Sequence, residues 1–283
     1  MVRRSGFLRR MMMRSERKNG FRTVFFLLSA VLLTLPYQGR TDEFSPRIHI
    51  VTPEWEGQTH NDGTGFFFEI LKKIYEPEGV RVSWEFANWN RSLNLLRNGH
   101  ADAMPSVWKE DADAAGLKVP ALPLYIEYTV AVFKKELFPD WAGQNSLKGR
   151  SVVWYRGYDY HLRNPLKGII MHRMEIPEEG NLWRLLDADR VDAFIDSRID
   201  VDRYVDTHMV DTVVYRVAPL WGQKAYLAFS DRPSSMKLMH IFDKGMARLL
   251  ASGELEKLHE KWQVAGFNAS AWEQPGEIVL ESP

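Results

Sequence analysis

Histidine, cysteine and serine residues carry most catalytic and metal-binding chemistry, but in this chain their spacing fits no such motif. The eight histidines are scattered, with no His-x-x-x-His or His-Glu-x-x-His pair, so we predict no metal site. The chain has no cysteine, which excludes a thiol nucleophile, a thiolate–zinc site and a disulfide. Gly63-Thr-Gly65 lacks the rest of a dinucleotide fingerprint, and no Gly-x-Ser-x-Gly elbow occurs. Noncovalent binding without a cofactor is therefore the chemistry we expect.

Aromatic residues near the ends of predicted strands are candidates for such binding. Trp55 follows a predicted strand over residues 47–51, and a ring there can stack on an apolar or cationic group. At four similar positions, core packing is the favoured alternative to a ligand contact: Trp89, Trp108, Tyr125 and Trp154. The 10 tryptophans could serve sugar stacking, but composition alone does not bring them together.

The elements that would position these residues alternate between short apolar strands and helices, which is typical of an α/β protein. Strands are predicted at 47–51, 80–86, 101–104, 128–133, 151–155, 191–195 and 225–229. Helices are predicted at 67–74, 89–98, 182–186 and 235–262, the last with a weak point near Gly253. Residues after Gly266 are expected to form a loose tail.

One segment of the chain occurs twice in outline. Leu95-Leu-Arg-Asn-Gly-His-Ala-Asp102-Ala-Met resembles Leu185-Leu-Asp-Ala-Asp-Arg-Val-Asp192-Ala-Phe, 90 positions later. Both segments have the pattern of a helix, a tight turn, an aspartate and a buried strand. We therefore expect two similar α/β halves, with a ligand in the crevice between them.

The charges are unevenly distributed, although the formal net charge of the 283 residues is zero. Residues 1–40 hold nine basic residues and one acidic residue, whereas the other 243 hold 28 basic and 36 acidic residues. An acidic body argues against nucleic-acid binding. The basic start and the largely apolar run of 13 residues at 23–35 predict a secretory signal peptide over about 1–40 and a periplasmic location. A helix needs about 20 apolar residues to span a bilayer, which is more than this run contains. An uncleaved, slightly short anchor is therefore the less favoured alternative.

Five short motifs follow one another along the rest of the chain: Gly65-Phe-Phe-Phe-Glu-Ile-Leu, Leu95-Leu-Arg-Asn-Gly-His-Ala-Asp-Ala, Ser146-Leu-Lys-Gly-Arg-Ser-Val, Arg190-Val-Asp-Ala-Phe-Ile-Asp196 and Gly253-Glu-Leu-x-Lys-Leu-x-x-Lys-Trp262. In order and spacing, over about residues 46–263, they resemble the family 3 extracellular solute-binding proteins, the polar amino-acid-binding components of ABC transporters.

The resemblance implies an α/β, two-lobed periplasmic binding protein fold of type II. Two crossover strands would join the lobes, and the ligand cleft would lie between them. Lobe 1 would comprise 46–132 plus 226–266, lobe 2 would comprise 133–225, and 267–283 would be a C-terminal tail. Hinge closure around the ligand is the expected motion.

The resemblance also implies roles for particular residues. Asp196 matches the position whose carboxylate holds the ligand's ammonium group, and Trp55 matches an aromatic ring placed over the ligand. Ser106, Trp108 and Lys109 occupy a loop that in the family supplies hydroxyl and backbone contacts, followed by an arginine for the ligand's α-carboxylate. That arginine is absent here. Lys109 or Arg91 could replace it as a point charge, without the same bidentate fork.

In the second lobe, Arg156-Gly157-Tyr158 would form a turn that contacts an anionic group. Gly157 would allow close approach of the backbone, and Tyr158 replaces the usual small hydroxyl residue, which implies an altered pocket. Asp102 and Asp192 match a strand-start aspartate that is mostly structural in the family.

The function we expect is capture of a small polar solute, an amino acid or a related compound, by a periplasmic monomer that presents it to a membrane permease. One alternative is a ligand-sensing protein that reports to a membrane receptor. Another is a dehydratase of the same fold acting on prephenate-like acids. It would need a general acid in the cleft, for which Glu54 and His161 are the candidates.

Overall fold

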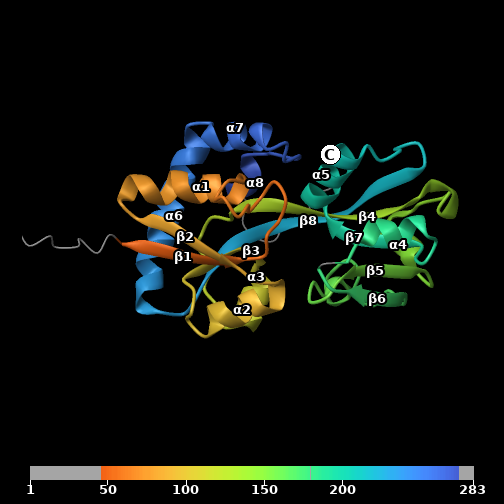
Figure 1. Cartoon of the computed structure of the whole chain (residues 1–283), viewed down its shortest axis with the longest axis horizontal. Coiled ribbons are helices and arrows are strands. Elements are labelled where there is room, and N and C mark those ends of the chain that lie inside the picture. The colour runs from red at the N-terminus through yellow and green to blue at the C-terminus, as the bar shows by residue number, and fades with distance from the viewer. Residues whose placement is uncertain (1–45, 179, 274–283) are drawn as a thin grey trace, which may run out of the picture. The chain divides into compact units, whose positions relative to one another are not determined.

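A mixed sheet of eight strands, in the order β2-β1-β3-β8-β4-β7-β5-β6, runs through the computed structural model, which describes residues 46–178 and 180–273 (Figure 1). One end of the sheet consists of β1 (Arg47–Thr52), β2 (Arg81–Phe86) and β3 (Ala103–Trp108). The other end consists of β5 (Ser151–Tyr155), β6 (His172–Ile176) and β7 (Ala193–Ser197). The described residues belong to one compact unit, Ser45–Pro283. The predicted signal peptide lies outside them.

Two long antiparallel strands, β4 (Tyr125–Lys134) and β8 (Tyr215–Phe229), form the middle of the sheet and connect its two ends. They pair from Tyr125 with Ala225 to Lys134 with Tyr215. These are the two crossover strands that the sequence led us to expect, and the two-lobed α/β fold is confirmed. The strand expected at 225–229 begins ten residues earlier, because the ladder continues past Pro219, next to a shift in register between Thr129 and Val130.

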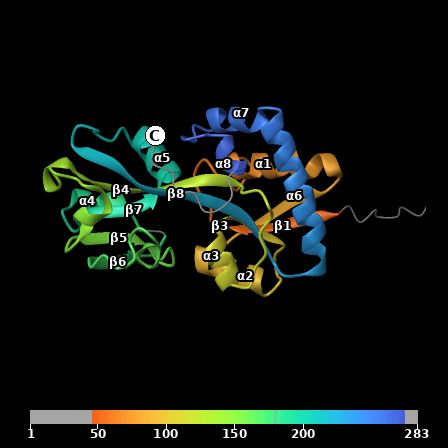
Figure 2. The same ribbon diagram turned by 180° about the vertical axis from the view of Figure 1, so that it is seen from behind.

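Helices cover both faces of the sheet around β1 and β3 (Figure 2). On one face, α1 (Phe66–Tyr75), α6 (Pro233–Ala251) and α7 (Glu254–Lys261) pack on a core that includes Ile48 and Ile50. On the other face, α2 (Trp89–Arg97) and α3 (Lys109–Ala114) pack against residues such as Val51 and Met104. Side chains of β1 thus contribute to both cores, as alternation along a strand requires.

At the other end of the sheet, α4 (Leu182–Asp187) and α5 (Arg198–His208) pack on β4 and β7 around Val130 and Phe194. Along β4, Val130 and Val132 enter this core, while Ala131 and Phe133 enter the core on the opposite face. Four 3₁₀ turns complete the connections: Glu76–Glu78, Lys135–Leu137, Gly143–Leu147 and Tyr160–Leu162.

The segment that occurs twice in the sequence forms the same structure twice. Asn88 caps α2, because its Oδ1 accepts a hydrogen bond from the backbone N–H of Arg91 at 3.0 Å. Asn181 caps α4 in the same way, accepting from the N–H of Arg184 at 3.0 Å. Such a cap satisfies a helix N–H that has no partner within the helix.

The two aspartates of this repeat also have matching partners. Asp102 Oδ2 accepts a hydrogen bond from the backbone N–H of His49 in β1 at 2.8 Å. Asp192 Oδ2 accepts from the N–H of Ser151 in β5 at 2.8 Å. Each carboxylate therefore ties the start of one strand to its neighbour, which agrees with the structural role expected from the sequence.

The C-terminal segment is only partly the loose tail that we expected. The predicted helix over 235–262 divides into α6 and α7 at Gly253, as its weak point indicated. A further helix, α8 (Ser270–Glu273), follows, and Trp272 is buried against the ring of His259, with centroids 5.8 Å apart. Apolar burial thus holds the chain in place to this point.

None of the described helices is long and apolar enough to cross a membrane.

Candidate ligand site between the lobes

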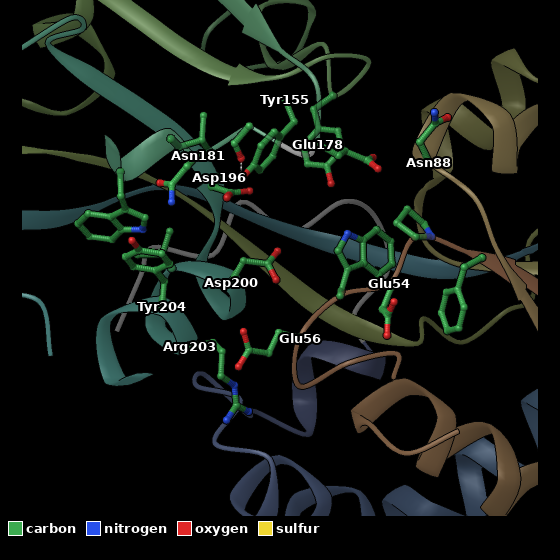
Figure 3. A pocket seen from close by; sticks show the side chains of 18 of the residues that line it. Glu54, Glu56, Asn88, Tyr155, Glu178, Asn181, Asp196, Asp200, Arg203 and Tyr204 are labelled. Carbon is green, nitrogen blue, oxygen red and sulfur yellow. Dashed lines mark hydrogen bonds between the residues drawn. The ribbon is translucent and has the colours of Figure 1, made fainter. Parts of the chain in front are cut away.

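A cleft of about 590 Å³ opens between the two lobes (Figure 3). From the first lobe it is lined by the loop after β1, residues 53–56, and by residues 86–88 after β2. From the second lobe it is lined by Tyr155 and Tyr158 near the end of β5, by residues 180–183, and by residues at the end of β7 and on α5. The carboxyl ends of parallel strands therefore meet at this cleft, which is the usual ligand position in α/β folds.

A smaller cavity of about 40 Å³ adjoins the cleft and shares Trp55, Tyr158 and Asp200 with it. Its other lining residues come from both lobes: Gln58, Trp89, Ser106, Trp108, Asp111, Tyr125, Glu127, Gly157, Tyr160 and Ser197. A volume of this size holds a few water molecules or one small polar group.

The structure brings most of the sequence-predicted residues to these two cavities. Trp55, Tyr158 and Asp196 line the cleft. Ser106, Trp108 and Gly157 line the smaller cavity, as do Trp89 and Tyr125. The side chain of Trp154 instead lies fully buried in the core.

Three predicted residues are not brought to either cavity lining. Lys109 forms an ion pair with Asp113, with Nζ 2.7 Å from Oδ2, one turn along α3. Arg91 and Arg156 are exposed on the surface. The point charge that we expected from Lys109 or Arg91 in place of an arginine therefore does not reach the cavities.

Glu127 lies buried in the smaller cavity, although it belongs to an apolar strand. Trp108 Nε1 donates a hydrogen bond to Glu127 Oε2 at 2.8 Å, and Ser106 Oγ lies 3.5 Å from the same oxygen. Ser106 has a φ of 62° at the irregularity between β3 and β8, a conformation uncommon outside glycine. Its hydroxyl lies 3.1 Å from Tyr125 Oη. These neighbours fix the Glu127 carboxyl group in the cavity.

Two further carboxyl groups face the same space. Asp196 is the last residue but one of β7 and has 6% of its surface exposed. Its Oδ1 accepts a hydrogen bond from the N–H of Ser197 at 2.8 Å. Asp200, in the first turn of α5, accepts from Gln58 Nε2 of the first lobe at 2.6 Å. Figure 3 shows both carboxyl groups at the centre of the cleft.

Burial raises the pKa of these carboxyl groups, because their charged forms lose contact with water. Burial raises the pKa of Glu127 to about 7. The pKa of Asp196 is also raised to about 7, mainly by burial and further by the nearby Glu127. For Asp200, burial and then the charges of Asp196 and Glu127 raise the pKa well above its usual range.

Positive charge is scarce around these groups. Among the described residues, no lysine, arginine or histidine forms an ion pair with Glu127, Asp196 or Asp200. Arg203 lines the cleft, but its guanidinium donates to the backbone carbonyl of Trp262 at 3.1 Å and points away from Asp196 (Figure 3). The cavities are therefore suited to a positively charged group.

Contacts across the cleft hold the two lobes close together. Glu178 Oε1 accepts a hydrogen bond from the backbone N–H of Trp89 at 3.0 Å. Arg163 of the second lobe forms an ion pair with Asp111 of the first and lies over the ring of Trp108, 5.8 Å from its centroid. The structure thus shows the lobes in a closed arrangement.

Sequence reasoning missed Glu127 and Asp200 as site residues. Glu127 carried a signal, since it is a lone acid within the apolar run from Tyr125 to Phe133. Asp200 could have been found through α5, where Val201, Tyr204 and Val205 recur at helical spacing. The signal for Glu127 is therefore an acidic residue that interrupts a run of buried apolar residues.

Of the two residues considered as general acids for a dehydratase, only one lies in the cleft. Glu54 lines the cleft, but His161 lies outside both cavities and stacks on Trp154 at 5.7 Å between centroids. The ligand atoms of Asp159, His161 and Glu175 lie within 4.8 Å of one another, which is close enough for a metal ion. That group lies outside the cleft lining, with Glu175 exposed and Asp159 and His161 partly buried.

Comparisons with known proteins identify a family of ligand-binding proteins, which agrees with a cleft between two lobes. The family model described as bacterial extracellular solute-binding proteins, family 3, matches residues 51–265. A search of curated proteins gives no match.

Many solved structures have the same fold. An ancestral arginine-binding protein bound to arginine matches with a TM-score of 0.62 and 18% identity, over 76% of this chain and 97% of its own. A histidine kinase sensor domain similar to periplasmic binding proteins matches with a TM-score of 0.64 and 20% identity, over 77% and 96%. The amino acid ABC transporter substrate-binding protein AbpA from Streptococcus pneumoniae, bound to L-arginine, matches with a TM-score of 0.61 and 21% identity, over 80% and 96%.

Proposed function

The chain belongs to the bacterial extracellular solute-binding proteins, family 3, and from this premise we propose that it captures a small polar solute between its lobes and presents it to a membrane permease. The solute is an amino acid or a related cationic compound. The partner is the permease of an ABC-type transporter, as in the amino-acid transporters to which several similar structures belong.

The observation that carries this proposal is the position of Asp196. Its carboxyl group is buried at the end of β7, lines the cleft and has no ion-pair partner among the described residues. A buried carboxylate is costly unless a positive group accompanies it. A bound cation supplies that group, and Trp55 from the opposite lobe supplies an aromatic surface.

The proposed site combines residues from both lobes: Trp55, Ser106, Trp108, Gly157, Tyr158 and Asp196. We assign 46–132 and 226–266 to lobe 1 and 133–225 to lobe 2, since β4 and β8 are the only described strands that pass between them. Arg91, Lys109 and Arg156 are left out because they line neither cavity. We further propose that the protein acts in the periplasm, as a monomer, without catalysing a reaction.

A second candidate function is ligand sensing, which the similarity to a histidine kinase sensor domain favours. Capture of the solute would be the same, but the closed form would dock on a membrane receptor. Uptake of labelled ligand by cells that carry or lack this chain separates the two functions. Transport requires that uptake be lost with the chain, whereas sensing leaves uptake intact and abolishes a transcriptional response.

A thermal-shift screen over amino acids, amines, small acids and sugars tests the capture step. A ligand at 100 times its Kd stabilises the folded state by about 2.7 kcal/mol. We expect a hit among cationic compounds, and Asp196→Asn should abolish it. Asp206→Asn, an exposed position on the same helix as Asp200, is the matched control and should keep the hit. A hit that persists in Asp196→Asn contradicts the assigned site, and the absence of any hit contradicts the function.

A further inference from the structure

Among the charged residues that line the two cavities, acidic ones predominate. Seven carboxyl groups line one cavity or both: Glu54, Glu56, Asp111, Glu127, Glu178, Asp196 and Asp200. Arg203 is the single basic residue in the two linings. Beyond burial, the charge of Glu127 raises the pKa of both Asp196 and Asp200. Positive groups on a ligand would favour the ionised forms of these carboxyl groups, so a ligand with two positive groups fits this space better than one with a net charge of zero or +1.

The basic groups nearest to the cavities are already engaged. Arg203 donates to the carbonyl of Trp262, as described above. The guanidinium of Arg163 lies between Asp111 and Glu110, the latter at 3.8 Å. Lys224 pairs in register with Ile126, so its side chain leaves β8 on the opposite face of the sheet from Glu127.

A carboxylate on the ligand would consequently have no cationic partner in this space. It would stand close to Glu127, Asp196 and Asp200, and like charges in a buried site repel strongly. Recognition of a carboxylate normally uses a bidentate arginine or several converging N–H donors. Among the described residues, neither cavity lining offers such an arginine directed into it.

The two cavities provide separate places for two positive groups. In the smaller cavity, Glu127 is surrounded by aromatic rings, with Trp108 and Tyr160 5.9 Å apart between centroids. In the cleft, Asp196 lies among Tyr155, Tyr158 and Trp183. Carboxylates combined with aromatic faces are well suited to ammonium and guanidinium groups. Asp200 lines both cavities and lies between the two places.

We propose that the ligand is an organic dication without a carboxylate, in which an apolar chain joins two ammonium groups or one ammonium and one guanidinium group. This inference rests on the proposed function, because it takes the cleft to be the solute site. One positive group binds against Glu127 in the smaller cavity, and the other binds against Asp196 in the cleft. The apolar chain runs along Trp55 and Tyr158, which line both cavities.

The protonation of the site supports the same conclusion. Burial holds the pKa of both Glu127 and Asp196 at about 7 in the ligand-free protein. A cation beside each group favours its ionised form and lowers its pKa. Binding at neutral pH should therefore release protons, which calorimetry in buffers of different ionisation enthalpy measures.

Pairs of ligands that differ only by a carboxylate test the inference on the unmodified protein. The pairs are 1,5-diaminopentane with lysine, and 1-amino-4-guanidinobutane with arginine, titrated by isothermal calorimetry at pH 8. We expect the carboxylate-free member of at least one pair to bind at least tenfold more tightly.

The other outcomes separate this inference from the proposed function. Equal or tighter binding of lysine or arginine overturns the inference and leaves solute capture intact. The same holds if only a neutral or anionic solute binds in the thermal-shift screen. If no solute binds at all, both the inference and the proposed function are overturned.

Two variants locate the positive groups. Glu127→Gln keeps the acceptor for Trp108 Nε1 but removes the charge, and it should weaken binding of 1,5-diaminopentane at least tenfold. In at least one of the two variants, Glu127→Gln or Asp196→Asn, the loss of affinity should be clearly smaller for 1-aminopentane than for 1,5-diaminopentane. Glu136→Gln, at an exposed position outside both linings, is the control and should bind the diamine normally. Equal losses for both amines in both variants would overturn the two-point arrangement.

Discussion

Gln58 Nε2 lies 2.6 Å from Asp200 Oδ1, and this hydrogen bond joins the loop after β1 to helix α5 across the cleft. Gln58 is 2% exposed, so its amide is withdrawn from water in the closed arrangement. Because the two residues belong to different lobes, opening of the cleft would break the bond. The contact therefore stabilises the closed form specifically, and it couples closure to a carboxyl group that lines both cavities.

Removal of this contact should weaken ligand binding. Gln58→Ala is expected to lower affinity by a few-fold to tenfold, since a hydrogen bond contributes about 0.5–1.5 kcal/mol. The dissociation rate should account for most of the change, because the bond forms only after closure. Stopped-flow tryptophan fluorescence measures both rates. Gln144→Ala, on a residue that lines neither cavity, is the control, and an equal affinity in both variants would contradict this role.

Gly157 should be required for full closure. It has a φ of 91°, and a Cβ atom at this position would lie 2.7 Å from Asn90 Oδ1 of the other lobe. Gly157→Ala should therefore reduce ligand affinity at least tenfold, as measured by calorimetry. Gly168→Ala is the matched control, because its φ is 88° and its Cβ would meet nothing within 4 Å. Backbone strain alone would affect both variants, so equal affinities would argue against closure at Gly157.

The repeated aspartates should affect stability without affecting binding. Asp192→Ala removes the acceptor for the N–H of Ser151, and the loss of a charged hydrogen-bond partner costs about 1–3 kcal/mol. Urea denaturation should show this decrease in the free energy of unfolding. Ligand affinity of the folded variant should stay within about twofold of the unmodified protein. A variant of unchanged stability would show that the strand-start contact contributes nothing.

Much of the fold could be predicted because hydrophobic periodicity reflects burial directly. Alternating apolar residues marked β1 and β2. The repeated Leu-Leu to Asp pattern marked equivalent helix–strand units in both lobes. The edge strand β6 was missed because its residues are largely exposed and show no alternation. The first half of β8 was missed because Pro219 and Gly222 interrupt a strand whose pairing with β4 is a long-range contact.

The site was predicted only in part, for a related reason. Trp55, Tyr158 and Asp196 follow predicted strands, so position along the chain indicated their place in the cleft. Glu127 and Asp200 acquire their importance from groups distant in sequence, such as Gln58, which lies 142 residues before Asp200. The family resemblance also suggested Lys109 as a cleft cation, but its ion pair with Asp113, one turn along α3, holds it elsewhere.

The contribution of Glu127 and Asp196 to the stability of the ligand-free protein should fall as pH rises from about 4 to 7. Burial raises the pKa of Glu127 and Asp196 to about 7 from their usual values of 4.5 and 3.8. Within this window the folded protein keeps protons that the unfolded chain has lost, so each proton stabilises the folded state. Each group contributes a slope of about −1.4 kcal/mol per pH unit, which ends above its folded pKa.

His259 acts in the opposite direction over part of this window. Burial lowers its pKa from 6.5 to about 4, so the unfolded chain binds a proton that the folded protein does not. Its contribution to stability is present above pH 6.5 and is lost as the pH falls toward 4. Total stability is therefore a sum of opposing slopes, and the contribution of Asp196 must be isolated by difference.

Asp196→Asn isolates that contribution. Urea denaturation of the ligand-free protein at pH 5, 6, 7 and 8 should give a slope that is less negative in the variant by about 1 kcal/mol per pH unit between pH 5 and 6. The difference should be much smaller between pH 7 and 8, because Asp196 passes its folded pKa of about 7 there and becomes largely ionised in the folded as well as the unfolded state. Asp206→Asn should leave the slope unchanged, since that side chain is exposed. If the free energy of unfolding depends on pH in the same way in Asp196→Asn and in the unmodified protein, the pKa of Asp196 is not raised. In that case the burial of Asp196 would not favour a bound cation as inferred above.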